Sequence, residues 1–197
     1  TQLKLKLARW FIMGKKYGII LADPPWKYGS KGPRGGKFAK LDYDDMTIGD
    51  LCAMDVKSIC EKDCSLHMWA TGSFIEDAIK VGNAWGFKFI RIDKVWVKKK
   101  ESGKPHAACG PWGMSDCEFI LLFVRGSMCS KQEGKRNQYV SAPEVYTGKH
   151  SEKPASFRDQ IDERYQEGLN KLEMFARYPV EGWDVFGNEA PNSIEIK

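Results

Sequence analysis

The sequence predicts an α/β fold, with a mostly parallel β-sheet that carries helices on both faces. Short apolar runs alternate with segments of helical spacing along the 197 residues, which is typical of parallel strands joined by crossover helices. Polar or Pro- and Gly-containing motifs directly follow several of these runs. Ligands bind at the carboxyl ends of the strands in such sheets, so functional residues are expected there.

The first predicted strand is the apolar run 17–22, which stops at Asp23-Pro24-Pro25 because two prolines cannot continue a central strand. Thr47 is a good N-cap for a helix over 48–61. The remaining elements follow in order: a strand at 64–70, a helix from Ser73 to Trp85 ended by Gly86, strands at 88–97 and 118–124, a helix from Ser156 to about Leu169, and strands at 171–176 and 183–186.

The chain has a net charge of +5, and three stretches without regular patterning hold clusters of basic residues. Lys and Arg cluster in the Gly-rich stretch 28–40 and in the irregular stretch 126–150, and Lys alone clusters in the irregular stretch 98–116. Loops this long in a compact domain are often functional. Clustered cations are suited to nucleic-acid phosphates, although a solvated surface explains any single cluster equally well.

Several classes of protein are disfavoured by composition. None of the six cysteines forms a Cys-x-x-Cys pair, so buried thiols are favoured over the alternative of Cys60, Cys64 and His67 as metal ligands, and we expect no metal and no disulfide. No window is apolar enough to span a bilayer, and the N-terminus has no signal-peptide pattern. These features predict a cytoplasmic protein without a membrane partner.

The segment Asp23-Pro24-Pro25-Trp26 has a composition suited to methylating the 6-amino group of adenine. That nitrogen is a poor nucleophile because its lone pair is delocalised into the ring. A carboxylate (Asp23) and the carbonyl of Pro24 offer two acceptors for its hydrogens, on a backbone that the prolines make rigid. Trp26 would stack on the base for about 1–3 kcal/mol. The alternative is an ordinary strand–turn with a surface Trp.

Further motifs accompany this segment in a specific order. They include Tyr43-Asp44-Asp45-Met46-Thr47, Leu66-His67-Met68-Trp69, Val95-Trp96-Val97-Lys98, Glu118 with Arg125-Gly126, Ser151-Glu152-Lys153-Pro154, Leu172 to Arg177, and Gly182 to Glu189. Over roughly residues 17–190 the chain resembles the catalytic subunit of the eukaryotic messenger-RNA adenosine methyltransferase and its small bacterial and phage relatives. This resemblance implies a Rossmann-like class I methyltransferase in permuted order, with the catalytic motif ahead of the cofactor motif.

The resemblance also implies roles for single residues, with S-adenosyl-L-methionine as the cofactor. Asp23 would contact the methionyl amino group as well as the target amine, and Lys153 would pair with the methionyl carboxylate. The adenosine half would be lined by Glu173, Phe175, Arg177, Asn188 and Glu189. Surface charges are the alternative for Lys153 and Arg177. The chain departs from the eukaryotic enzyme at Tyr178-Pro179-Val180, where that enzyme has His-Asn.

The resemblance favours DNA over RNA as the nucleic-acid partner, because the small size is like that of bacterial and phage enzymes. Tyr43, Lys98 and Trp112 are candidates for contact with the target strand, although packing explains Tyr43 and Trp112 as well. The competing interpretations are an RNA adenine methyltransferase, a methylase for cytosine or glutamine, and a non-catalytic nucleic-acid-binding paralogue. A homodimer or a paralogous partner is plausible by analogy. We expect a single domain over 13–197, preceded by an N-terminal extension, 1–12.

Overall fold

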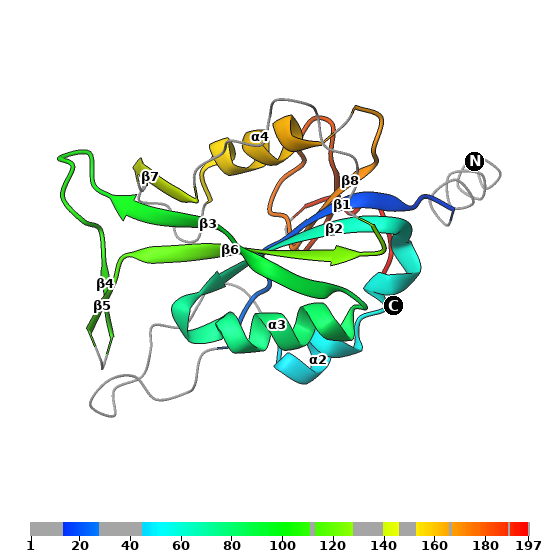
Figure 1. Cartoon of the computed structure of the whole chain (residues 1–197), viewed down its shortest axis with the longest axis horizontal. Coiled ribbons are helices and arrows are strands. Elements are labelled where there is room, and N and C mark those ends of the chain that lie inside the picture. The colour runs from blue at the N-terminus through cyan, green and yellow to red at the C-terminus, as the bar shows by residue number, and fades with distance from the viewer. Residues whose placement is uncertain are drawn as a thin grey trace.

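The centre of the molecule is a twisted seven-stranded sheet with the strand order β7-β3-β6-β2-β1-β8-β9 (Figure 1). The computed structural model describes residues 14–27, 45–110, 113–127, 140–145, 153–165, 167–188 and 190–196. The strands of this sheet are β1 (Tyr17–Ala22), β2 (Cys60–Thr71), β3 (Lys88–Lys99), β6 (Cys117–Arg125), β7 (Ser141–Val145), β8 (Lys171–Met174) and β9 (Asp184–Phe186).

Parallel pairing dominates this sheet, as the sequence predicts. β1 is parallel to β2 and β8, β8 to β9, and β3 to β7, whereas β6 is antiparallel to both of its neighbours. The start of β6 therefore lies at the edge where the parallel strands end: Glu118 is in register with Thr71 of β2 and Trp96 of β3. This one reversed strand places a carboxylate at the edge of the sheet that also carries Asp23.

Helices cover both faces of the sheet (Figure 1). On one face, α2 (Ile48–Ala53) and α3 (Ile75–Ala84) pack over a core that includes Leu51, Val81 and Phe123. On the other face, α4 (Ala155–Arg164) buries Phe157 and Ile161 against a second core cluster. Trp69 lies in that cluster and meets the Phe157 ring edge to face at 5.1 Å, so the first turns of α4 pack directly on the sheet.

The helices predicted from 48 and 156 begin within one residue of the predicted start but end earlier, whereas α3 begins at Ile75, two residues after the predicted Ser73, because a 3-10 turn, Gly72–Phe74, precedes it. Thr47 caps α2 and forms a reciprocal capping box with Asp50, as its position predicts. α2 nevertheless ends at Ala53, because Asp55 accepts from the Ser58 backbone N–H and starts a separate 3-10 helix, Val56–Ile59. α4 stops at Arg164 rather than near 169, where the chain becomes extended at Tyr165 before it turns into β8.

Two stretches expected to be irregular contain strands. Within 98–116, β4 (Ala108–Gly110) pairs with β5 (Gly113–Ser115), and this hairpin projects from the body of the molecule (Figure 1). Within 126–150, β7 adds to the edge of the sheet by pairing with β3. The predictions were wrong here because short strands gain their stability from pairing rather than from local sequence.

Candidate active site

Asp23, Pro24 and Pro25 directly follow β1 and are tied to the structure on both sides. The backbone N–H of Asp23 donates to the Met174 carbonyl of β8, and the Pro25 carbonyl accepts from Met46 N–H. The Pro24 carbonyl accepts from Trp26 N–H at 2.9 Å, which leaves it one further lone pair. These bonds make the three residues a fixed ledge at the carboxyl end of the central strand.

A chain of alternating charges runs from the ledge along the sheet edge. Lys153 Nζ lies 2.7 Å from Asp23 Oδ2 and 3.3 Å from Glu118 Oε2, and Lys98 pairs with the other oxygen of Glu118. We call Asp23, Lys153, Glu118 and Lys98 the cleft network. The Asp23 side chain is still 34% exposed, whereas those of Lys153 and Glu118 are 16% and 13% exposed. Asp23 is thus the member most open to a ligand.

The cleft network favours the charged forms of Lys153 and Glu118. Burial opposes the charge on Lys153, but Asp23 and Glu118 outweigh it and raise the pKa of the ammonium. Burial also works to raise the pKa of Glu118, but Lys153 and Lys98 lower it below its ordinary value. Burial raises the pKa of the Asp23 carboxyl, and Lys153 and Arg177 oppose the rise. A more basic carboxylate is a better hydrogen-bond acceptor.

A cleft of about 600 Å³, part of it open to solvent, lies beside this network. It opens between the carboxyl ends of β1 and β8 and the start of α4. The strands that directly follow β1 in the chain lie on one side of it, and β8 and β9 lie on the other side. Ligands bind at such a switch point in the strand order. Its lining includes five residues singled out in the sequence: Asp23, Lys153, Glu173, Phe175 and Arg177. The structure therefore brings together groups from positions 23 and 153–177.

Phe175 enters the cleft from a sharp turn at the end of β8. The residue has φ 63°, a left-handed conformation that is uncommon outside glycine and ends the predicted strand two residues early. Gly187 packs against this turn, and a Cβ at position 187 would lie 2.2 Å from the Ala176 carbonyl oxygen. Gly187 is therefore required for the end of β9 to approach the Phe175–Ala176 backbone.

Trp26 and Lys98 make contacts other than those expected. The Trp26 ring is 5% exposed, stacks on Phe74 at 5.4 Å between centroids and donates its indole N–H to the Trp69 carbonyl. These contacts hold Trp26, and with it the adjoining ledge, against the core. Its stacking on a base stays a prediction. Lys98 faces Glu118 and the Trp96 ring, so its contact with a target strand also stays a prediction.

Of the predicted site residues that remain, the structure describes Asn188 alone. Asn188 is exposed and is not among the residues that line the cleft. Tyr43, Trp112 and Glu189 lie outside the described residues. Among the residues that are described, no group of three His, Cys, Asp or Glu side chains is arranged to hold a metal ion. Nor is any described helix long and apolar enough to cross a membrane.

Sequence reasoning gave no role to two residues that the structure places beside the cleft. Glu118 links Lys153 to Lys98, and Arg158 of α4 holds Glu173 through a 2.7 Å ion pair. A charged residue that opens an otherwise apolar strand was a usable signal for Glu118. Arg158 lies on a helix with polar residues on most sides, so its sequence context carries no comparable signal.

Comparison with known proteins covers the residues of this site. The family model for MT-A70 matches residues 17–189, a span that contains the whole ledge, the cleft network and the cleft. The chain belongs to the MT-A70 family. The family predicted from the motifs, the class I methyltransferase fold and the methyltransferase activity are thereby confirmed.

Three relatives show the range within the MT-A70 family. The type II methyltransferase M.MunI of Mycoplasma sp is 35% identical, over 92% of this chain and 82% of its own length. The N(6)-adenosine-methyltransferase catalytic subunit METTL3 of Homo sapiens is 27% identical over 90% of this chain, which spans 29% of that larger protein. The N6-adenosine-methyltransferase non-catalytic subunit MTB of Arabidopsis thaliana is 29% identical, over 46% of this chain and 11% of its own length.

Proposed function

We propose that this MT-A70 family member transfers a methyl group from S-adenosyl-L-methionine to the 6-amino nitrogen of adenine in DNA. The observation that carries the proposal is the ion pair between Asp23 and Lys153 at the mouth of the cleft, beside the Asp-Pro-Pro ledge. One acidic and one basic group, 2.7 Å apart, match the two charges of an amino-acid zwitterion. The 35% identity to M.MunI, which covers most of both chains, supports an enzyme of the same kind.

The residues in the cleft fit this cofactor. Lys153 would hold the methionyl carboxylate and Asp23 the methionyl ammonium, so binding exchanges one internal ion pair for two. Glu173, whose carboxylate Arg158 orients, would accept from ribose hydroxyls, and the Phe175 ring would cover the adenosine. The bound cofactor would supply a methyl group activated by its sulfonium and would leave as S-adenosylhomocysteine, and the methylated nitrogen would lose one proton to solvent.

The ledge acts on the acceptor amine. Asp23 and the remaining lone pair of the Pro24 carbonyl accept the two hydrogens of the amine, which localises its lone pair and aims it into the cleft. The burial-raised pKa of Asp23 strengthens the first of these hydrogen bonds. Because the base must leave its stack to reach the ledge, the reaction requires base flipping from a duplex.

The insertion between β3 and β6 has features suited to a DNA backbone. The insertion between β3 and β6 begins at the carboxyl edge of the sheet and carries exposed Lys100 and Lys104. Its β4–β5 ribbon projects from the body (Figure 1) and exposes Met114 by 66%. Two-stranded ribbons enter DNA grooves, and lysines at their base contact phosphates. We therefore assign the insertion to the target strand.

The first experiment measures transfer of tritiated methyl from S-adenosylmethionine to duplex DNA, single-stranded DNA and RNA that contain adenine. We expect label as N6-methyladenine in duplex DNA. Asp23→Asn keeps the shape of the side chain and should lower the rate by about a hundredfold or more, the scale of losing one positioned charge at a reacting centre. Lys80→Ala, an exposed change on α3, is the matched control and should keep full activity.

The outcomes separate the alternatives. Label that enters RNA in preference to DNA contradicts the substrate assignment but keeps the chemistry. Cofactor binding without any label indicates that a target sequence or a partner subunit is missing, as a relationship to non-catalytic subunits allows. A chain that does not bind the cofactor is not an enzyme, and the binding-module interpretation then replaces this one.

A further inference from the structure

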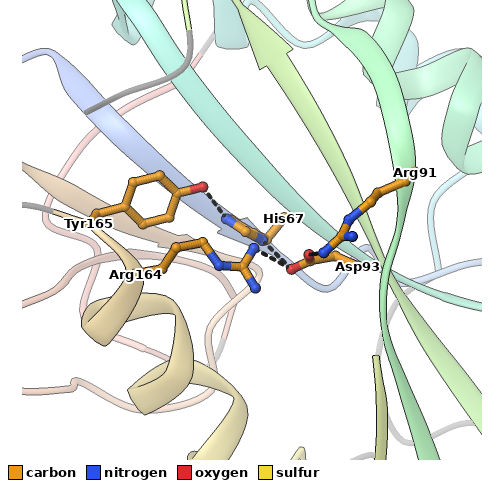
Figure 2. A network of polar contacts seen from close by, with 5 residues as sticks. All are labelled: His67, Arg91, Asp93, Arg164 and Tyr165. Atoms are coloured by element: carbon orange, nitrogen blue, oxygen red, sulfur yellow. Dashed lines mark hydrogen bonds and ion pairs between the residues drawn. The ribbon is translucent and has the colours of Figure 1, made fainter. Parts of the chain in front are cut away.

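A second charged cluster lies on the same face of the sheet, at the far end of α4 (Figure 2). Arg164 Nη1 lies 2.6 Å from Asp93 Oδ2, and the Tyr165 hydroxyl lies 2.9 Å from His67 Nε2. His67 Nδ1 is 3.5 Å from the same Asp93 oxygen. We call His67, Asp93, Arg164 and Tyr165 the α4 anchor. It joins β2 and β3 to the end of α4.

The α4 anchor is sealed from solvent. The side chains of His67 and Asp93 are 0% exposed, and that of Arg164 is 10% exposed. Arg91 reaches Asp93 Oδ1 from the opposite side at 3.1 Å (Figure 2). Burying several charged groups is costly, and an apolar cluster of similar volume would hold a helix on a sheet at least as well. Hydrophobic packing alone does not account for these polar residues.

The α4 helix connects the α4 anchor at one end to cleft residues at the other. Lys153 and Pro154 directly precede the helix, and Phe157 and Arg158 of its first turns line the cleft. Ten helical residues span about 15 Å, so the helix acts as a short rigid rod between the cleft and the α4 anchor. Apolar contacts allow a helix to slide or rotate, whereas Arg–carboxylate and Tyr–His hydrogen bonds fix its rotation and its position along the axis.

We propose that the α4 anchor is a positioning device for the cofactor site, in which Arg164 and Tyr165 fix α4 on the sheet so that Lys153 and Arg158 keep their register with Asp23 and Glu173. The four residues of the anchor do not line the cleft, so they act only through the helix. This proposal rests on the proposed function for the identity of the ligand, but not for the effect on α4.

The test uses the full chain and two mild variants. Tyr165→Phe removes the hydroxyl that meets His67, and Arg164→Lys keeps the charge but loses the planar guanidinium. We expect each to weaken binding of S-adenosylhomocysteine, measured by calorimetry without DNA, by about three- to tenfold, the size of one lost hydrogen bond. Hydrogen exchange of the α4 amides, measured without any ligand, should become faster, whereas α3 should be unchanged.

The control is Val81→Ala, which makes a cavity under α3 on the other face of the sheet. This variant should lower the melting temperature about as much as Tyr165→Phe and Arg164→Lys do, but it should leave both the ligand affinity and the hydrogen exchange of the α4 amides unaltered. The proposal is overturned if the two anchor variants lower only the melting temperature, as in the control. If the wild-type chain binds no cofactor, the proposed function fails, and the exchange of the α4 amides still decides the positioning role.

Discussion

The cleft network and the α4 anchor contain similar side chains but differ in their access to solvent. Asp23 in the cleft is 34% exposed and shares Lys153 with Glu118, so a ligand can reach and replace its partner. Asp93 in the α4 anchor is 0% exposed and surrounded by Arg164, Arg91 and His67. Exposure, more than the type of ion pair, therefore separates a group that can exchange partners from one that fixes an element.

The first prediction compares the loss of stability on replacing Asp93 with the loss on replacing Asp23. Asp93→Asn removes the buried carboxylate that pairs with Arg164 and should cost about 3–5 kcal/mol of unfolding free energy. Asp23→Asn should change stability by less than about 1 kcal/mol, because its site is partly solvated. Urea unfolding of both variants measures the difference. Equal losses would remove the distinction between the two clusters.

A second prediction concerns Lys153, whose ammonium is held charged between two carboxylates. Lys153→Met keeps most of the side-chain volume and should weaken cofactor binding by about ten- to a hundredfold, as expected for a charge-assisted bond to a carboxylate. Calorimetric titration gives the dissociation constant. Lys80→Met, an exposed change on α3, is the matched control and should bind normally.

A third prediction concerns the pH dependence of stability, which depends on His67 in the α4 anchor. Burial lowers the pKa of His67, although Asp93 opposes it, so the folded chain keeps the imidazole neutral where the unfolded chain takes up a proton. Stability should therefore fall as pH drops below about 6.5, by at most about 1.4 kcal/mol per pH unit. His67→Phe should flatten this slope between pH 6.5 and 5, and Tyr165→Phe should keep it. Thermal unfolding at several pH values provides the measurement.

The smallest expected effect distinguishes the two roles of Trp26. Trp26→Phe keeps an aromatic ring against Phe74 but removes the indole N–H that donates to Trp69, so stability should fall by about 1 kcal/mol. If bracing the ledge is its role, the Michaelis constant for DNA should stay within about twofold. A large rise in that constant with unchanged stability would favour base stacking instead.

The elements predicted best from sequence are those with a local physical signal. The strand at 17–22 has its predicted bounds because its apolar run is closed by two prolines, and Thr47 begins α2 because capping is a short-range interaction. The short strands β4, β5 and β7 were missed because their stability comes from pairing and not from the pattern of a single strand, and the end of α2 was missed because the Asp55 cap interrupts an otherwise helical pattern. Mostly parallel pairing was predicted, whereas nothing in β6 itself marks its reversed direction.

From the sequence, the resemblance indicated the family and five of the residues that line the cleft, and an apolar run closed by two prolines indicated the ledge after β1. The tertiary structure alone shows that Glu118 pairs with Lys153, that Arg158 pairs with Glu173 and that Trp26 donates to the Trp69 carbonyl. It also assembled the α4 anchor from β2, β3 and α4. The physical reason is that burial and pairing belong to three-dimensional neighbours, which residue spacing along the chain does not specify.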